Sequence, residues 1–353
     1  MKPRLFVIVF CVVMLNKFAY CSETANISDV DNAACYYKEA ALIFKQSNPQ
    51  SLSQEQQCKY IDELRVYYPI KDIKNADKLF ELFRQGCNQK KCVWGTDFSR
   101  EGFFTTLYYA NDVKMLSNFI NSVVIEKFLN GSNKETIELL LCNLILSKRI
   151  VEERCIVNFI TACNEQEMCI KIANKILDKL TSHELKRLHD GFNLQTQLPL
   201  LSEIVLAERD ILISWIKNNP AHFLQCLESV ANPVMIESGA MMGYKTNNVT
   251  PAKSEIKKAK QKLKHVDYIM IDKYYKKLSE STRVNKKNFN GDYDINNEIK
   301  QLPNSITKEI LLNTIPSLKD AYQHEQSLKS QKELFKTNIK KRNRSRNYKS
   351  VEF

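Results

Sequence analysis

Apolar residues recur every three or four positions through most of residues 30–220, which is the spacing of amphipathic α-helices. No alternating pattern is long enough to predict a strand, so the chain is expected to be all-α. The expected helices cover residues 32–46, 76–85, 101–129, 149–162, 165–180 and 199–217. Three capping boxes, in which two side chains satisfy free N–H groups of a first turn, also predict helix starts. They pair Ser53 with Gln56, Ser132 with Glu135, and Thr181 with Glu184.

The pattern changes after Thr250, which can cap a helix that has Pro251 at its first position. A stripe of apolar residues then predicts one long amphipathic basic helix. The stripe consists of Ile256, Ala259, Leu263, Val266, Met270 and Tyr274. Residues 283–305 are rich in Asn, Lys and Asp, so they are expected to form a loop or linker. A last helix is expected after Pro316, and the basic end at residues 340–346 is expected to be disordered.

The first 21 residues have the pattern of a secretory signal peptide. Lys2 and Arg4 precede an apolar run over residues 5–15, and small residues at Ala19 and Cys21 favour cleavage after Cys21. The run is too short to span a bilayer, and no later stretch approaches the roughly 18 apolar residues that a membrane helix needs. The mature chain is therefore expected to be soluble, within the secretory pathway, in an organelle of that pathway or outside the cell.

The cysteines that follow the signal peptide all lie before residue 227. They are Cys35, Cys58, Cys87, Cys92, Cys142, Cys155, Cys163, Cys169 and Cys226. In an oxidising compartment this distribution predicts a disulfide-stabilised helical domain over residues 22–240, with one thiol left over. The pairing stays open, although Cys87 with Cys92 and Cys163 with Cys169 are separations that can close local loops. Because there is no C-x-x-C motif, no metal site is expected.

Charge divides the chain at nearly the same place. The 353 residues contain 52 Lys and Arg against 40 Asp and Glu, and residues 251–353 alone contain 24 basic and 12 acidic residues. We expect this C-terminal region to bind an acidic partner through Lys257, Lys258, Lys260, Lys262, Lys264, Lys340, Lys341, Arg342, Arg344 and Arg346. Outside the cell, basic clusters of this kind bind sulfated glycans, anionic lipid head groups or acidic proteins. The signal peptide argues against nucleic acid as the partner. In the alternative interpretation, the stripe packs on the helical domain and the lysines are simply solvated.

Little in the sequence predicts catalysis. Eight glycines and five histidines argue against Gly-rich phosphate loops and histidine-centred sites, and no G-x-S-x-G, H-E-x-x-H, Walker or G-x-G-x-x-G motif is present. The chain is therefore expected to be non-enzymatic, without a cofactor. A secreted cysteine-dependent enzyme remains an alternative, in which His183, His189 or His222 would partner the odd cysteine. A spacing of six places His183 and His189 on different helix faces, which argues against a joint site.

Residues 102–110 are the most aromatic stretch of the chain, with Trp94 shortly before them, and we expect these rings to lie in the core rather than on a recognition surface. Together with the signal peptide, the helical region from Cys35 to Cys226 and the cysteine-free charged extension, this stretch resembles the rhoptry-associated protein 1 family of piroplasm parasites (Babesia and Theileria). The resemblance implies secretion into rhoptries, a part in attachment to or invasion of red cells, and no enzymatic activity. Expected partners are a host-surface protein, a sulfated glycan or another rhoptry protein, and peripheral membrane contact is compatible with the basic region. A structural subunit of a secretory-organelle complex is the alternative.

Overall fold

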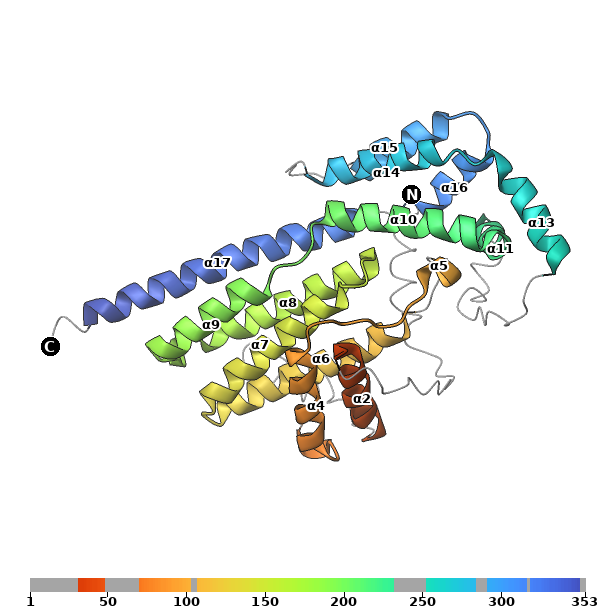
Figure 1. Ribbon diagram of the computed structural model, residues 1–353. Coiled ribbons are helices and arrows are strands. Elements are labelled where there is room, and N and C mark those ends of the chain that lie inside the picture. The colour runs from red at the N-terminus through yellow and green to blue at the C-terminus, as the bar shows by residue number, and fades with distance from the viewer. Residues whose placement is uncertain are drawn as a thin grey trace.

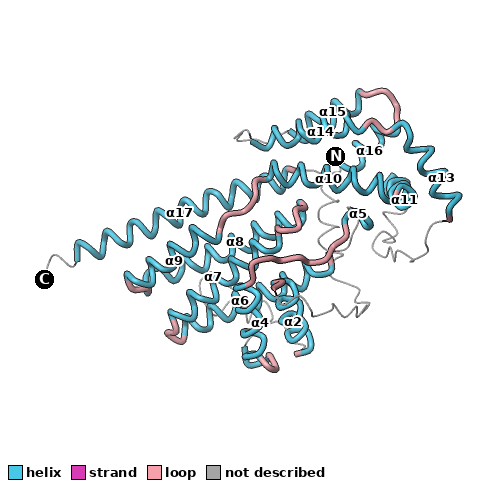
Figure 2. The backbone as a smooth tube through the Cα atoms, viewed as in Figure 1, coloured by secondary structure: helices cyan, strands magenta, loops and turns pink. Residues whose placement is uncertain are grey.

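The structure is a computed structural model that describes residues 31–47, 70–102, 107–231, 252–283, 291–315 and 318–349. Within these ranges helices and loops make up the fold and no strand is formed (Figure 2), which confirms the all-α prediction. The α-helices are α2 (Ala33–Gln46), α4 (Ala76–Asn88), α5 (Phe98–Glu101), α6 (Tyr108–Leu129), α7 (Asn133–Ile150), α8 (Ile156–Ile176), α9 (Ser182–Gln195), α10 (Leu201–Asn218), α11 (Pro220–Ala231), α13 (Lys253–Lys262), α14 (Tyr268–Arg283), α15 (Gly291–Gln301), α16 (Ile306–Thr314) and α17 (Lys319–Lys349).

Helices α6, α7 and α8 form the centre of the fold, and each packs against the other two. Helices α2 and α4 cover one side of this centre, whereas α9 and α17 lie along another (Figure 1). Phe119 of α6 is fully buried, with its ring 5.2 Å from Phe44 of α2 and 5.9 Å from Phe80 of α4. Burying one such side chain contributes about 2 to 3 kcal/mol, so contacts of this kind fix α2 and α4 against α6.

Aromatic rings join the N-terminal helices to the loop that precedes α5. Trp94 stacks on Tyr109 with ring centroids 4.5 Å apart and on Tyr37 at 6.1 Å, and all three side chains are buried. The Trp94 indole N–H donates to the carbonyl of Arg149 at 3.1 Å. The prediction that aromatic residues of this region lie in the core is confirmed for Trp94 and Tyr109, while residues 103–106 lie outside the described ranges.

Several helix limits differ from the predicted ones. Helices α2, α4 and α10 lie close to their predicted ranges, but α7 runs on to Ile150 and α8 is one continuous helix where two were expected. The turn between α7 and α8 ends where the buried Glu208 of α10 accepts the backbone N–H of Ile156 at 2.8 Å. Because this acceptor comes from a helix some 50 residues away, the local pattern could not locate the start of α8.

Of the three predicted capping boxes, the structure forms the one at Thr181. Thr181 and Glu184 form the predicted box: Glu184 N–H donates to Thr181 Oγ1 at 3.3 Å, and Thr181 N–H donates to Glu184 Oε2 at 2.7 Å. Helix α7 starts directly after Ser132, as the second box predicted, but Ser132 makes no side-chain capping bond, so the box itself does not form. The Glu135 carboxylate pairs with Lys127 at 3.0 Å instead of reaching back to the Ser132 backbone. Ser53 and Gln56 lie outside the described residues.

The predicted long basic helix is two helices with a break at Val266 and Asp267. Asp267 donates its backbone N–H to Thr307 Oγ1 at 2.8 Å, and its Oδ1 accepts the N–H of Met270 at 2.9 Å, so its side chain caps α14. The start differs as well, because Glu255 Oε2 accepts the N–H of Ala252 at 2.9 Å, while Thr250 and Pro251 lie outside the described residues. The linker predicted over residues 283–305 contains α15, which buries Ile295 and Ile299.

Helix α17 is the longest helix described and runs to Lys349, so the predicted disorder of residues 340–346 is wrong. It packs along α8 and contacts α9, where Phe335 lies 4.5 Å from Phe192 between ring centroids. Gln331 reaches Glu167 of α8 at 3.1 Å, and the buried Glu325 accepts the N–H of Leu201 at 3.3 Å. Charge and cysteine content change near residues 240–250, yet the helices before and after that point share one hydrophobic core.

Candidate functional site

The five lysines predicted for the first basic cluster are all exposed. Lys257, Lys258, Lys260 and Lys262 lie on α13, and Lys264 lies in the single 3-10 turn (Leu263–His265) that follows it. Glu228 of α11 pairs with Lys262 at 2.7 Å. Among the described residues, no ion pair reaches the other four lysines. These four, Lys257, Lys258, Lys260 and Lys264, are called the α13 surface below.

The opposite face of α13 is apolar and already packed. Ala259, Leu263 and Val266 are buried, and α13 contacts α11. The stripe therefore packs on the helical body, as the alternative interpretation of the sequence predicted, and it is not left open for a partner chain. Packing of this face turns the lysines outward, because the polar side of an amphipathic helix lies opposite its packed apolar stripe.

The second basic cluster lies elsewhere. Lys340 and Lys341 are exposed near the end of α17, where Arg342 donates to the carbonyl of Asp178 at 2.7 Å and pairs with its carboxylate at 3.3 Å. Arg344 and Arg346 also lie in α17, but their side chains are outside the described part. Figure 1 places this end of α17 and α13 at opposite ends of the molecule. The ten basic residues predicted as one binding set are thus divided between two distant surfaces.

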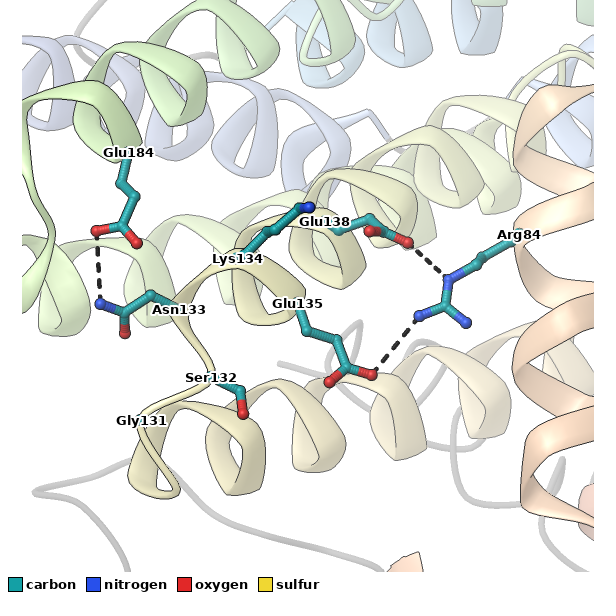
Figure 3. Close-up of a pocket in the computed structure, with 8 residues that line it drawn as sticks. All are labelled: Arg84, Gly131, Ser132, Asn133, Lys134, Glu135, Glu138 and Glu184. Carbon is teal, nitrogen blue, oxygen red and sulfur yellow. Dashed lines mark hydrogen bonds and ion pairs between the residues drawn. The ribbon is translucent and has the colours of Figure 1, made fainter.

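A shallow polar hollow of about 590 Å³ lies between α4, the start of α7 and the start of α9 (Figure 3). Arg84 crosses it, with its Nε 2.6 Å from Glu138 and a terminal nitrogen 3.7 Å from Glu135. Asn133 donates to Glu184 at 3.5 Å on the other side of the hollow. Each carboxylate in it thus has a basic or amide partner from the protein, and partly exposed pairs of this kind contribute at most about 1 kcal/mol each. The hollow is an ion-pair cluster that joins three helices.

The cysteines in the described ranges form no disulfide in this structure. The described cysteines are Cys35, Cys87, Cys92, Cys142, Cys155, Cys163, Cys169 and Cys226, and Cys58 lies outside these ranges. Cys163 and Cys169 both lie in α8, six residues apart, so their positions are separated by about 9 Å along the helix axis. Since a disulfide requires Cα atoms within about 7 Å, the local loop proposed for these two cannot form. No bond joins Cys87 to Cys92 either.

Burial keeps most of these thiols protonated. Desolvation raises the pKa of Cys163 to about 12 and raises the pKa values of Cys87, Cys92, Cys155 and Cys169 as well. Cys142 differs from these five, because the interaction with the neighbouring Cys87 thiol lowers the pKa of Cys142. It is also only half-buried, so Cys142 combines access with a more easily formed thiolate.

One cysteine has a histidine beside it. Cys226 Sγ lies 3.6 Å from His222 Nε2, one turn away on α11, and the Trp215 indole N–H donates to His222 Nδ1 at 3.3 Å. Because Nδ1 is the acceptor, the neutral imidazole carries its proton on Nε2 and faces the sulfur as a donor. Burial also raises the pKa of Cys226 to about 11. This arrangement lacks the free basic nitrogen that an activated cysteine nucleophile needs.

Two carboxyl groups that the sequence analysis did not single out are buried in the core. Burial raises the pKa of Glu165 and that of Glu208 to about 7. Glu165 accepts from the Ser117 hydroxyl, and Glu208 accepts from Ile156 N–H. A glutamate on an otherwise apolar helical stripe was the available indication, since Glu208 lies four residues after Ile204 and four before Leu212.

Among the described residues, no cluster of three or more His, Cys, Asp or Glu is arranged to hold a metal ion. In the same part of the chain, none of the helices combines the length and apolarity needed to cross a bilayer. Comparisons with protein-family models, with curated proteins and with solved structures find no match for the chain. What the protein binds is therefore inferred from its own residues.

Proposed function

We propose that the protein is a non-enzymatic binding protein whose α13 surface captures an acidic partner, with a sulfated glycan as the partner class. The observation that supports this most directly is the density of charge on one short element: residues 253–264 contain six lysines and one glutamate. In the described structure only Glu228 pairs with this stretch from another helix, through Lys262. Lysine is a compact charge on a flexible stem, which suits the irregular sulfates of a polysaccharide better than one rigid acceptor.

In the proposed mechanism, one face of α13 attaches the helix to the protein and the other face binds the partner. The packed face formed by Ala259, Leu263 and Val266 fixes α13 to the helical body, and the lysines project from the other face. Attraction between exposed charges is screened within about 8 Å at physiological salt, so binding by this surface should weaken steeply as salt rises. The distant cluster at Lys340 and Lys341 would add a second, independent contact on a long polymer.

The setting of this binding is proposed from the chain's resemblance to the rhoptry-associated protein 1 family and from the signal peptide predicted at residues 1–21. We infer secretion into a rhoptry-type organelle of an apicomplexan parasite and attachment to the red-cell surface. Disulfide stabilisation of the helical body belongs to the same proposal, because an oxidising secretory compartment is where buried thiol pairs are converted to disulfides.

Charge reversal tests the function better than truncation. A chain that ends near residue 250 would lose α14 and α17, and with them core side chains such as Tyr275 and Phe335. The triple variant K257E/K258E/K260E leaves the Lys262 pair and the packed face intact. At about 0.5 kcal/mol for each unit of exposed charge that is changed, it should weaken binding to immobilised heparin by about 100-fold at low salt.

The matched control is K74E/K90E/K171E, which makes the same change of net charge at three exposed lysines outside α13. The control should retain most of its heparin binding and its binding to intact red cells. Equal loss by both variants would show that only the overall charge of the chain matters and would refute the proposed surface.

A further inference from the structure

Cys87 and Cys142 are brought together by two helices that are distant in sequence. Cys87 lies in the last turn of α4 and Cys142 in the middle of α7, and these helices pack against each other. The Cys87 thiol donates to the backbone carbonyl of Cys142 at 3.4 Å, and the two thiol groups are close enough for each to shift the pKa of the other. Their 55-residue separation in sequence means that this proximity is a product of the fold.

A tyrosine completes the cluster. The hydroxyl of Tyr37, on α2, donates to Cys87 Sγ at 3.5 Å in a fully buried position. Gly86 makes this approach possible, because a Cβ at residue 86 would lie 2.8 Å from the Tyr37 ring. Three helices thus converge on one pair of sulfur atoms.

We propose that Cys87 and Cys142 are a dithiol site that reacts with a small-molecule disulfide, such as oxidised glutathione, to form a disulfide bond between α4 and α7. This deepens the disulfide stabilisation included in the proposed function by naming a pair. The pairing itself follows from the packing of α4 on α7 and does not depend on which partner the α13 surface binds.

The reaction proceeds by two exchanges. The half-buried Cys142 loses its proton and attacks one sulfur of oxidised glutathione, which forms a mixed disulfide and expels one glutathione thiolate. Cys87 then loses its proton and attacks Cys142 Sγ, which expels the second glutathione. Two protein thiols are oxidised, one glutathione disulfide is reduced to two glutathione molecules, and the two protons end on those molecules.

The roles of the two cysteines follow from their surroundings. The neighbouring Cys87 thiol lowers the pKa of Cys142, and the charges of Arg84 and Arg187 act in the same direction. Burial raises the pKa of Cys87, so Cys87 acts second, once the mixed disulfide has placed an electrophilic sulfur beside it. Hydrogen bonding from Tyr37 and the charge of Arg149 favour the Cys87 thiolate at that stage.

The test is to incubate the full-length folded protein with oxidised glutathione, block the remaining thiols and map the peptides by mass spectrometry without reduction. A linked peptide pair containing Cys87 and Cys142 is expected as the main protein disulfide. The Cys87→Ala variant should stop at glutathione on Cys142, and the Cys142→Ala variant should leave Cys87 reduced. Cys163→Ala, at a buried thiol on α8, is the matched control and should still form the linked pair.

A second readout does not depend on the alanine variants. A bond that closes a loop of about 55 residues should raise the midpoint of thermal unfolding of the unsubstituted protein by about 5 °C. Independent glutathione adducts at both sites, a different linked pair as the main product, or both thiols remaining free would each overturn the proposal. Because heparin is absent from this assay, the outcome is separate from that of the α13 charge reversal.

Discussion

The buried carboxyl group of Glu208 should make the protein less stable as pH rises. Glu208 lies on α10 with 7% of its surface exposed, and it accepts the N–H of Ile156 at 2.8 Å. Burial raises the pKa of this carboxyl from its ordinary value near 4.5 to about 7. A shift of that size corresponds to about 3 kcal/mol of linkage between proton binding and folding.

The sign of the effect follows from which state holds the proton. Below about pH 4.5 both the folded and the unfolded chain are protonated at Glu208, so this group adds no pH dependence. Between about pH 4.5 and 7 only the unfolded chain releases its proton, which favours unfolding increasingly. Above about pH 7 the folded chain also ionises, and the loss of stability levels off at about 3 kcal/mol.

Glu208→Gln keeps an oxygen that can accept from Ile156 and removes the ionisation. Urea unfolding should give the variant a free energy of unfolding close to that of the parent at pH 4.5, and higher by up to about 3 kcal/mol at pH 8. Glu203→Gln, at an exposed position on the same helix, is the control and should keep the parent's pH dependence. If Glu208→Gln showed the same change between pH 4.5 and 8 as the parent, the burial argument would be refuted.

Two further substitutions test the packing of the helical body. Phe335→Ala removes a buried ring of α17 and should lower the free energy of unfolding in urea by about 3 to 5 kcal/mol, whereas Leu334→Ala, at the exposed neighbouring position, should change it by less than about 0.5 kcal/mol. Equal small effects would mean that α17 is not part of the core. Gly102→Ala should cost more than about 2 kcal/mol by thermal unfolding, because Gly102 has a φ of 70° and an added Cβ would lie 2.1 Å from the Trp215 ring. An unchanged midpoint would contradict the close approach of Gly102 to Trp215.

The sequence predicted local features well where their cause is local. The spacing of apolar residues was enough for the all-α class and for α2, α4 and α10, and the box at Thr181 and Glu184 involves residues three apart. Predictions became wrong where a distant residue decides the outcome. At the break between α13 and α14, Thr307 Oγ1 accepts a hydrogen bond from the N–H of Asp267. Thr307 lies outside residues 253–283, so the pattern of those residues could not predict the break.

The candidate sites divide in the same way. Exposure of the α13 lysines was predictable, because the stripe of Ala259 and Leu263 identifies the buried face of the helix. The separation of this cluster from Lys340 was not predictable, since it depends on the direction in which α17 crosses the fold. The proximity of Cys87 and Cys142 was not predictable either. It depends on the packing of α4 against α7, and the positions of the cysteines in the sequence do not show which of them are neighbours in the fold.

Lysine footprinting with heparin tests the central claim most directly. The full-length protein would be acetylated briefly with and without heparin, and the rate at each lysine read by mass spectrometry. The account predicts at least a several-fold slower reaction at Lys257, Lys258, Lys260 and Lys264, with unchanged rates at Lys74, Lys90 and Lys171. Protection that is equal at all exposed lysines, or confined to Lys340 and Lys341, would contradict the assignment of binding to the α13 surface.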